Sequence, residues 1–181
     1  MFPDHMRRYL IWLIVLLLMV AGALIAGGDE ENQGGPAKAR PPASGQSVYV
    51  EVERVVDGDT AKVFYEDGSR ESEYVRYIGI DTPESVQPGT PVECFSEESK
   101  DFNASLIEDN EMKMVFDEEQ RDRYGRLLAY VYVDGRMINA EMLRRGYATT
   151  LEISPNTSKA DQFSRLEDDA RDAGHGLWSA C

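Results

Sequence analysis

Five short segments of the chain are predicted to form β-strands, and residues 48–55 and 111–116 alternate apolar and polar residues with the period of two that is typical of strands. In the first, Val48, Val50 and Val52 alternate with Tyr49 and Glu51, which predicts a strand with one buried face. The second and third segments flank Asp67-Gly68, a dipeptide that favours the tight turn of a β-hairpin. The five predicted strands are residues 48–55, 61–65, 71–77, 111–116 and 127–133.

Three further segments have the apolar spacing or the end signals of helices. Ser96 begins the first, with two glutamates in its first turn, and Gly146 ends the second as a C-cap. The predicted helices are residues 96–108, 139–145 and 158–173. A helix after the third strand and more helices at the end do not suit a parallel sheet. The order predicts an α+β domain, a five-stranded β-barrel of the oligonucleotide- and oligosaccharide-binding (OB) fold with about three helices.

An N-terminal hydrophobic helix is predicted ahead of this domain. Arg7 and Arg8 precede an apolar run at residues 10–26, and acidic residues follow it. Seventeen helical residues span about 26 Å, close to the hydrocarbon thickness of a bilayer. Residues 1–26 are interpreted as a retained membrane anchor or, because Ala21-Gly22-Ala23 fits a cleavage pattern, as a signal segment. Either way the domain is expected outside the cytoplasm, anchored to the cell membrane or secreted.

Residues 27–46 are rich in glycine, proline, alanine and polar residues and have no apolar periodicity. This composition predicts a flexible linker. The folded domain is therefore expected to cover residues 47–181.

The predicted domain is strongly acidic. It contains 15 of the 19 Lys and Arg residues and 29 of the 33 Asp and Glu residues, and the net charge of the chain is −14. Such a surface repels a polyanion at low salt, whereas at molar salt the Debye length is about 3 Å and the repulsion is screened. Five lysines against fourteen arginines, with many acidic residues, favour a halophilic protein. A merely acidic secreted protein is the alternative interpretation.

Cys94 and Cys181 both lie in the part of the chain expected outside the cytoplasm. An even number of cysteines in an oxidising compartment favours a disulfide. In the chain-entropy model, closing a loop of nearly ninety residues contributes about 4–5 kcal/mol. Free or metal-bound thiols are the alternative, although two cysteines and one distant histidine make a poor zinc site.

Two acidic motifs enclose the predicted hairpin. Asp57-Gly58-Asp59-Thr60 precedes it, and a segment from Arg76 to Glu84 contains its last residues and those that follow. A hairpin brings its outer ends together, so Asp59 and Asp81 are expected to share one site. Asp57 and Gly58 are interpreted as turn formers. Carboxylates beside an arginine suggest a hard cation next to a phosphate group.

A third motif makes a resemblance specific. VDGDT, RYIGIDTPE and DRYGRLLAYVYVDG occur in this order, and GLWS stands near the end of the sequence. Together they resemble the thermonuclease (staphylococcal nuclease-like) family over about residues 50–179. The resemblance implies a calcium-dependent phosphodiesterase that acts on DNA and RNA and leaves 3′-phosphate ends. It also implies a nucleic-acid substrate; we expect the protein to be a monomer.

The resemblance assigns roles to individual residues. It implies Ca²⁺ binding by the carboxylates of Asp59 and Asp81 and the backbone oxygen of Thr82. The residues that match the family's catalytic positions are Arg76, Glu84 and Arg126. Arg123 and Tyr124, in the third motif, are expected to bind substrate.

The chemistry suits these residue types without reference to the family. Calcium prefers oxygen ligands, and guanidinium groups can hold phosphate oxygens at any working pH. A carboxylate such as Glu84 can orient the attacking water or accept its proton. The alternatives are a non-catalytic OB-fold module that binds nucleic acid or a partner, and a calcium-stabilised surface domain. The binding module would be favoured if the arginine, glutamate or aspartate positions were broken, and none of them is. The surface domain would explain the carboxylates but not Arg76 and Arg126.

One stretch departs from the family pattern. Where the type member carries tyrosines that stack on a nucleotide base, this chain has Leu151 and Ile153. Base stacking contributes about 1–3 kcal/mol per base. We therefore expect weaker or different binding of the base, with the phosphate chemistry retained.

Overall fold

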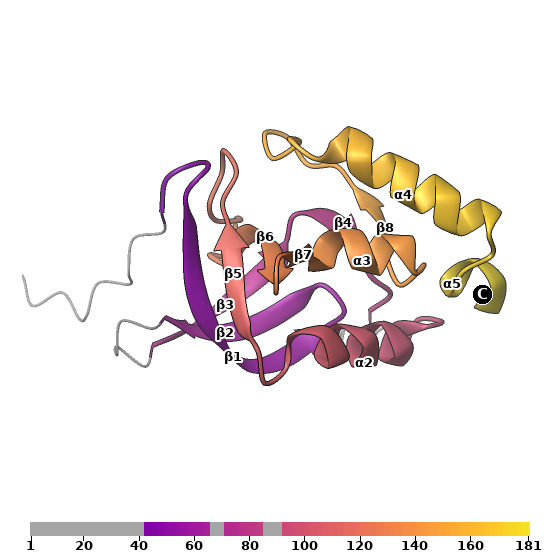
Figure 1. Cartoon of the computed structure of the whole chain (residues 1–181), viewed down its shortest axis with the longest axis horizontal. Helices are drawn as coiled ribbons and strands as arrows, with labels where there is room; N and C mark the ends of the chain where they lie inside the picture. Colours follow the sequence, from indigo (N-terminus) through magenta and orange to yellow (C-terminus); the bar gives the residue numbers. More distant parts are fainter. Residues whose placement is uncertain (1–41, 66–70, 85–91) are drawn as a thin grey trace, which may run out of the picture. The chain divides into compact units, whose positions relative to one another are not determined.

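Five strands form a closed β-barrel in the computed structural model, which describes residues 42–65, 71–84 and 92–181. Antiparallel pairing joins β3 to β2, β2 to β1, β1 to β5 and β5 to β6, and a parallel pairing of β3 with β6 closes the barrel (Figure 1). The predicted α+β class and five-stranded OB barrel are confirmed. The barrel strands are β1 (Ser47–Asp57), β2 (Thr60–Tyr65), β3 (Ser72–Tyr77), β5 (Glu111–Val115) and β6 (Leu127–Val133).

Shorter elements complete the domain. β4 and β8 form a separate two-stranded sheet, and β7 extends the β6 hairpin. Three helices and one four-residue helical turn follow β4 in the described residues. The bounds are β4 (Gly79–Asp81), β7 (Arg136–Met137), β8 (Thr149–Leu151), α2 (Ser96–Ile107), α3 (Ile138–Arg144), α4 (Ala160–Asp172) and α5 (Leu177–Ala180).

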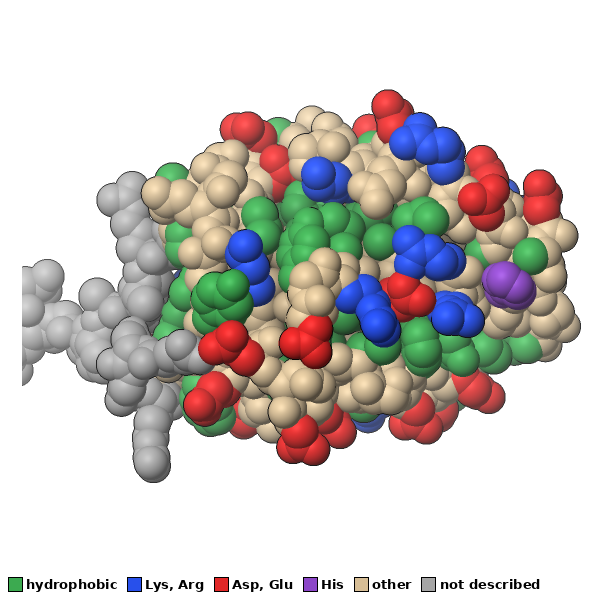
Figure 2. Space-filling model, viewed as in Figure 1, with side chains coloured by type: hydrophobic (Ala, Val, Ile, Leu, Met, Phe, Trp, Pro, Cys, Tyr) green, Lys and Arg blue, Asp and Glu red, His purple; other side chains and the backbone are tan. Residues whose placement is uncertain are grey.

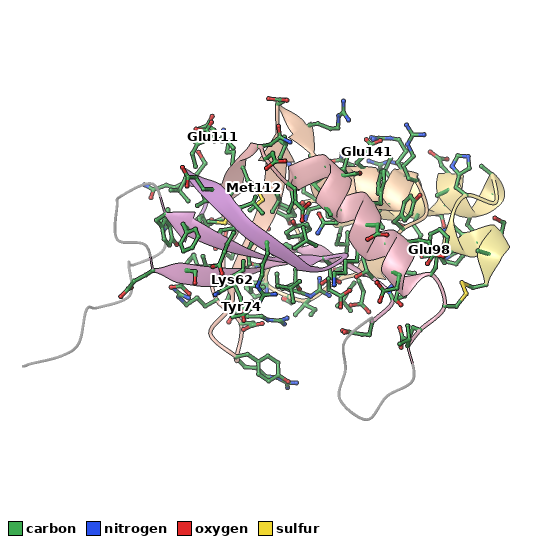
Figure 3. All side chains as sticks on the ribbon, turned by 90° about the horizontal axis from the view of Figure 1, so that it is seen from below. Lys62, Tyr74, Glu98, Glu111, Met112 and Glu141 are labelled. Atoms are coloured by element: carbon green, nitrogen blue, oxygen red, sulfur yellow. A yellow bond between two sulfur atoms is a disulfide. The ribbon has the colours of Figure 1, made fainter. Side chains whose placement is uncertain are left out.

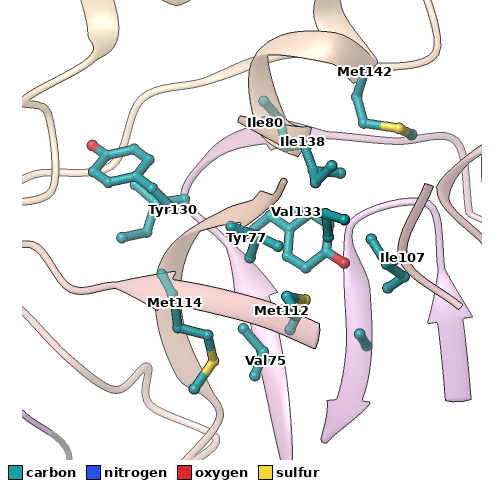
Figure 4. Close-up of a cluster of buried hydrophobic side chains, with 14 of the residues drawn as sticks. Val75, Tyr77, Ile80, Ile107, Met112, Met114, Tyr130, Val133, Ile138 and Met142 are labelled. Atoms are coloured by element: carbon teal, nitrogen blue, oxygen red, sulfur yellow. The ribbon is translucent and has the colours of Figure 1, made fainter. Parts of the chain in front are cut away.

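The alternating residues of the strands fill the barrel with apolar side chains. Val75 and Tyr77 of β3 are 0% and 1% exposed, and Met112 and Met114 of β5 are fully buried (Figure 4). Helices add the buried side chains of Ile107, Ile138 and Met142 to the same cluster. Burying one such side chain stabilises a fold by about 1.5–3 kcal/mol. The outward-facing residues of these strands are therefore free to carry polar chemistry.

A disulfide ties the C-terminal turn to the segment that enters α2. It joins Cys94 to Cys181, whose Cα atoms are 6.0 Å apart (Figure 3). The backbone at Gly146 packs against the backbone of His175 and Gly176. A Cβ on Gly146 would stand 2.2 Å from the carbonyl oxygen of His175, and a Cβ on Gly176 would stand 2.3 Å from that of Gly146. The Leu177 N–H also donates to the carbonyl oxygen of Gly146 at 2.9 Å.

The predicted anchor or signal segment, residues 1–26, and most of the predicted linker lie outside the described residues. Among the residues that the structure describes, no helix has both the length and the hydrophobicity needed to cross a membrane. All described residues belong to one compact unit, Lys38–Cys181. Acidic side chains lie around much of the outline of the face in Figure 2, as expected from the net charge.

Candidate active site

The turn between β1 and β2 holds Asp59 in a buried position. Its backbone carbonyl accepts a hydrogen bond from the Tyr77 N–H at 2.9 Å, which joins the turn to the end of β3. Asp59 as a whole residue is 6% exposed, and its Oδ1 accepts a hydrogen bond from the Thr60 hydroxyl at 2.9 Å. Asp57 stabilises the turn locally, because its Oδ1 accepts from the Gly58 N–H at 2.9 Å. The two ends of the predicted hairpin therefore meet.

Thr82 binds the second oxygen of Asp59 twice. Its backbone N–H donates to Asp59 Oδ2 at 2.9 Å and its hydroxyl donates to the same atom at 3.0 Å. Gly58 makes this approach possible, since a Cβ there would stand 2.8 Å from both Oγ1 and Cγ2 of Thr82. The glycine predicted as a turn former thus also provides space for a predicted calcium ligand.

Arg76 connects the two carboxylates. Its Nη1 lies 3.1 Å from Asp59 Oδ2, and its Nη2 donates to Asp81 Oδ1 at 2.7 Å. Nη1 also donates to the carbonyl oxygens of Tyr77, at 3.1 Å, and Ile80, at 2.7 Å. These two carbonyl groups, at the end of β3 and within β4, fix the position of the guanidinium group. We call Asp59, Arg76, Asp81 and Thr82 the carboxylate cluster.

Glu84 lies at the edge of the carboxylate cluster. Burial is the largest cause that raises the pKa of Glu84 above its usual 4.5, and the charges of Asp57 and Asp59 raise it further. Its backbone pairs with Glu93: the Glu84 N–H donates to Glu93 Oε2 at 3.0 Å, and the Glu93 N–H donates to the Glu84 carbonyl at 3.1 Å. Glu93, which the sequence analysis missed, therefore helps to hold Glu84 in place.

Negative charge is concentrated here. Burial raises the pKa of Asp81 above 3.8, and this effect exceeds the lowering by Arg76; Asp59 and Glu93 also raise it. A cation among these groups would offset the burial and the repulsion that make ionisation unfavourable.

The predicted donor set has the chemistry that a calcium ion prefers. Asp59, Asp81 and the Thr82 backbone offer only oxygen atoms, which hard cations prefer. Within the described ranges, no group of three or more His, Cys, Asp or Glu side chains is placed to hold a metal on its own. The predicted set of two carboxylates and a backbone oxygen would need further oxygen ligands from substrate or water, which calcium commonly accepts.

Arg126 is held by a tight turn before β6. Asp122 Oδ1 accepts from the backbone N–H groups of Tyr124 and Arg126, each at 2.9 Å. Asp122 Oδ2 accepts from Arg126 Nε at 2.7 Å. Arg123 and Arg126 both lie against the Tyr124 ring, with 4.7 Å and 5.7 Å from guanidinium carbon to ring centre. We call residues 121–126 the arginine turn.

A salt bridge anchors the arginine turn to the barrel. Arg121 forms two hydrogen bonds to the buried carboxylate of Glu73 on β3, at 2.9 and 3.2 Å. The parallel pairing sets Leu127 opposite Val75 and Leu128 opposite Arg76. Arg126, which precedes Leu127, therefore lies at the same end of this strand pair as Val75 and close in register to Arg76. Among the described residues, the side-chain hydrogen bonds and ring contacts of Arg123, Tyr124 and Arg126 stay within residues 122–126. The members of the carboxylate cluster thus contact one another directly, whereas Arg126 of the arginine turn is bound by its own neighbour, Asp122.

A buried asparagine of α2 supports the turn between β1 and β2. Asn103 is fully buried, donates from Nδ2 to the Asp57 carbonyl at 3.0 Å and accepts from the Tyr77 hydroxyl at 3.2 Å. The sequence analysis missed this residue. Its one available signal was a polar amide within an otherwise amphipathic helix.

Leu151 and Ile153 are exposed, at 37% and 60%. Leu151 pairs with Gly79 on β4, two residues from Asp81. The chain therefore presents the aliphatic side chain of Leu151 near the carboxylate cluster.

Comparisons with known proteins agree with the geometry. The family model described as "Staphylococcal nuclease homologue" matches residues 74–180. "Endonuclease YncB" of Bacillus subtilis (strain 168) is 37% identical over 155 residues, covering 83% of this chain and 72% of that protein. The "SPbeta prophage-derived endonuclease YokF" of the same organism is 40% identical, covering 73% of this chain and 44% of that protein. "Thermonuclease" of Staphylococcus hyicus is 31% identical over 147 residues, covering 81% and 85%. The chain therefore belongs to the staphylococcal nuclease family.

Proposed function

We propose that this protein is a calcium-dependent nuclease that hydrolyses phosphodiester bonds of DNA and RNA and leaves 3′-phosphate ends. Family membership supports the nuclease activity, and the names of its relatives support an endonuclease. The observation that carries the proposal is the contact of Arg76 with both Asp59 and Asp81, at 3.1 and 2.7 Å. It unites two acidic motifs with a phosphate-binding group.

Asp59, Asp81 and the Thr82 backbone oxygen would hold the calcium ion. When bound, Ca²⁺ supplies Lewis-acid polarisation of a phosphoryl oxygen. Thr82 keeps Asp59 Oδ2 in one orientation through two hydrogen bonds. Holding a ligand in place before substrate arrives reduces the ordering cost of the reaction.

The two arginines stabilise charge on the phosphate. Asp122 binds Arg126 through Nε, and the Nη groups of Arg126 make no hydrogen bond within the described part of the chain. They are available to two phosphate oxygens, a geometry that planar guanidinium groups match well. Arg76 approaches the same phosphate from the carboxylate cluster. Removing one such donor typically slows a reaction by about 10²–10³-fold.

Glu84 acts on the attacking water. The carboxylate orients the water or accepts its proton while the water oxygen forms a bond to phosphorus. The bond from phosphorus to the 5′ oxygen breaks, that oxygen takes up a proton, and the phosphate stays on the 3′ side. Arg123 and Tyr124 bind the substrate beside Arg126. Burial, and then the charges of Asp57 and Asp59, raise the pKa of Glu84, which favours its taking up a proton.

The cellular setting is part of the proposal. The apolar run at residues 10–26 supports export, with the domain anchored to the membrane or released after cleavage of a signal segment. The net charge of −14 and the scarcity of lysine support work at high salt, where repulsion of a polyanion is screened. We propose that the protein acts as a monomer.

The test is cleavage of single-stranded DNA and RNA by the full chain in detergent, with Ca²⁺ or a chelator, at low and molar salt. We expect Ca²⁺-dependent cleavage whose products carry a 5′-hydroxyl, which polynucleotide kinase labels without prior dephosphorylation. Arg136→Ala is the matched control for Arg126→Ala, because Arg136 is an exposed arginine of β7. Binding of the oligonucleotide without cleavage at any salt would instead support a non-catalytic OB-fold module.

A further inference from the structure

A row of outward-facing residues crosses three barrel strands next to the carboxylate cluster. Arg54 of β1 pairs with Lys62 of β2, and Lys62 pairs with Tyr74 of β3. Ala61, Val63 and Val75, the chain neighbours of Lys62 and Tyr74, are fully buried. Successive residues of a strand point to opposite faces, so Lys62 and Tyr74 face outward. We call Arg54, Lys62 and Tyr74 the β1–β3 row.

The row combines positive charge with an exposed aromatic ring. Lys62 Nζ lies 5.8 Å from the centre of the Tyr74 ring, and Tyr74 is 41% exposed (Figure 3). Arg54 is exposed and stands directly opposite Lys62, a like-charge pairing that costs a sheet stability. Among the residues that the structure describes, Glu53 forms an ion pair with Lys62 at 3.0 Å, so Arg54 and Lys62 stand with one paired carboxylate. The row thus places two cations on one face of a domain whose net charge is strongly negative.

The row is continuous with the proposed phosphate site. Tyr74 precedes Arg76 by two residues on β3, so both point to the same face about 7 Å apart along the strand. On β2, Thr60 pairs with Arg76 in the next row. On the other side of β3, Val75 pairs with Leu127, so the residues that precede them, Tyr74 and Arg126, enter this strand pair at the same end. A strand of nucleic acid held by Arg76 and Arg126 can therefore continue onto Tyr74, Lys62 and Arg54.

We propose that the β1–β3 row is a binding site for single-stranded nucleic acid beyond the cleaved bond. Tyr74 stacks on a base, and Lys62 and Arg54 contact the following phosphates; such stacking and charge contacts do not depend on sequence. The row supplies the aromatic surface that Leu151 and Ile153 do not provide. This inference rests on the proposed nuclease function and extends it to a second part of the substrate.

The other side of the barrel provides a matched control. Tyr49 of β1 pairs with Lys113 of β5, with Nζ 6.0 Å from the ring centre, and Tyr49 is 47% exposed. The next row there pairs Glu51 with Glu111, so one cation stands against two carboxylates. Tyr49 and Lys113 are thus a tyrosine–lysine pair like Tyr74 and Lys62, but they are surrounded by negative charge. They lie on β1 and β5, whereas Arg76 lies on β3.

The experiment compares two lengths of single-stranded DNA, of about four and about twenty nucleotides, because one OB fold covers about 4–16 nucleotides. The full chain in detergent is tested with Tyr74→Ala, with the double variant Arg54→Gln/Lys62→Gln, and with the controls Tyr49→Ala and Lys113→Gln. Cleavage gives KM and kcat for both lengths. Fluorescence anisotropy of a labelled long strand, with chelator present, gives Kd without cleavage.

We expect Tyr74→Ala to raise the Kd of the long strand by about 5- to 150-fold, the range that base stacking supports. Its KM should rise more for the long than for the short strand, while both controls behave as the wild type. The double variant should reduce the slope of log Kd against log salt by about 1.4, or about 0.7 for each phosphate that the variant no longer neutralises. Equal effects from the Tyr49 and Tyr74 variants, or a length-independent KM change, would overturn the inference.

The two proposals fail in different ways. A wild-type chain that binds the long strand through the row but cleaves nothing would contradict the nuclease proposal alone. A chain that cleaves both lengths with unchanged Kd and KM in the row variants would contradict this inference alone.

Discussion

The two halves of the site are held in different ways. Asp59 in the carboxylate cluster is 6% exposed, and its bonds reach Thr82, 23 residues further along the chain. In the arginine turn, Tyr124 is 69% exposed, and Arg126 is fixed by Asp122 only four residues away. The cluster therefore depends on the whole fold and contributes to its stability. Within the turn, residues 122–126 are held by local bonds, so the side chains of Tyr124 and Arg126 can be optimised for substrate with little effect on stability.

The largest expected effect on activity is that of a Glu84 variant. Unlike changes to the buried residues of the cluster, it should lower activity without lowering stability. Glu84→Gln should lower kcat by about 10²–10⁴-fold, because it removes a general base. Stability should not fall, since a carboxylate that resists ionisation is replaced by a neutral amide. Initial rates and urea unfolding measure the two quantities. A large loss of stability would show that Glu84 is a structural part of the cluster.

Arg126→Ala tests the independence of the arginine turn. We expect kcat to fall by about 10²–10³-fold, as for loss of one donor to a charged transition state. The free energy of unfolding should change by no more than about 0.5 kcal/mol, because the salt bridge to Asp122 is local and near the surface. Arg126→Lys should not restore activity, since an ammonium group cannot make a bidentate contact. Full activity in Arg126→Lys would contradict the proposed geometry.

Asp59→Asn and Asp81→Asn test the contribution of the cluster to stability. Asp59→Asn should destabilise the fold by about 1–3 kcal/mol, because buried donors of Thr82 and Arg76 lose a charged acceptor. Asp81 has a side chain that is 50% exposed, so its variant should cost less than about 1 kcal/mol. Urea unfolding in chelator compares the pair without metal. Equal losses would mean that burial does not distinguish the two carboxylates.

The smallest effect is a pH dependence of stability in chelator. The pKa values of Asp81 and Glu84 are raised in the fold, mainly by burial, from 3.8 and 4.5. The folded protein then binds more protons than the unfolded chain between these values and the raised ones. Stability from the two groups therefore falls as pH rises through that window. Asp81→Asn/Glu84→Gln should flatten this part of the urea midpoint profile, whereas Arg126→Ala should leave it as in the wild type.

Much of the fold was predictable because its longer elements have clear periods. The strand predicted at residues 127–133 coincides with β6, and the first two helices begin within one residue of their predicted starts. β4 and β8, of three residues each, are too short to show a period of two. Their position follows from pairing between distant segments, which a single sequence does not display.

The site was predictable where residues stand in a motif and not where packing decides. Asp59, Asp81 and Arg76 lie in short motifs at the ends of a hairpin. Asp122 had a readable signal, its four-residue spacing from Arg126. The β1–β3 row had none, because a register shift between Val52 and Arg54 sets Arg54 opposite Lys62. A bulge adds a residue without changing the local composition.

The disulfide gives the molecule a particular covalent topology. With a sequence separation of 87 between Cys94 and Cys181, the oxidised chain is a large ring that carries a linear arm. Arg126 belongs to the ring, whereas Asp59, Arg76, Asp81 and Glu84 all belong to the arm. A protease that cuts once within the ring leaves a single covalent molecule with both halves of the site attached. A single cut in the arm between Glu84 and Cys94 separates the carboxylates from Arg126.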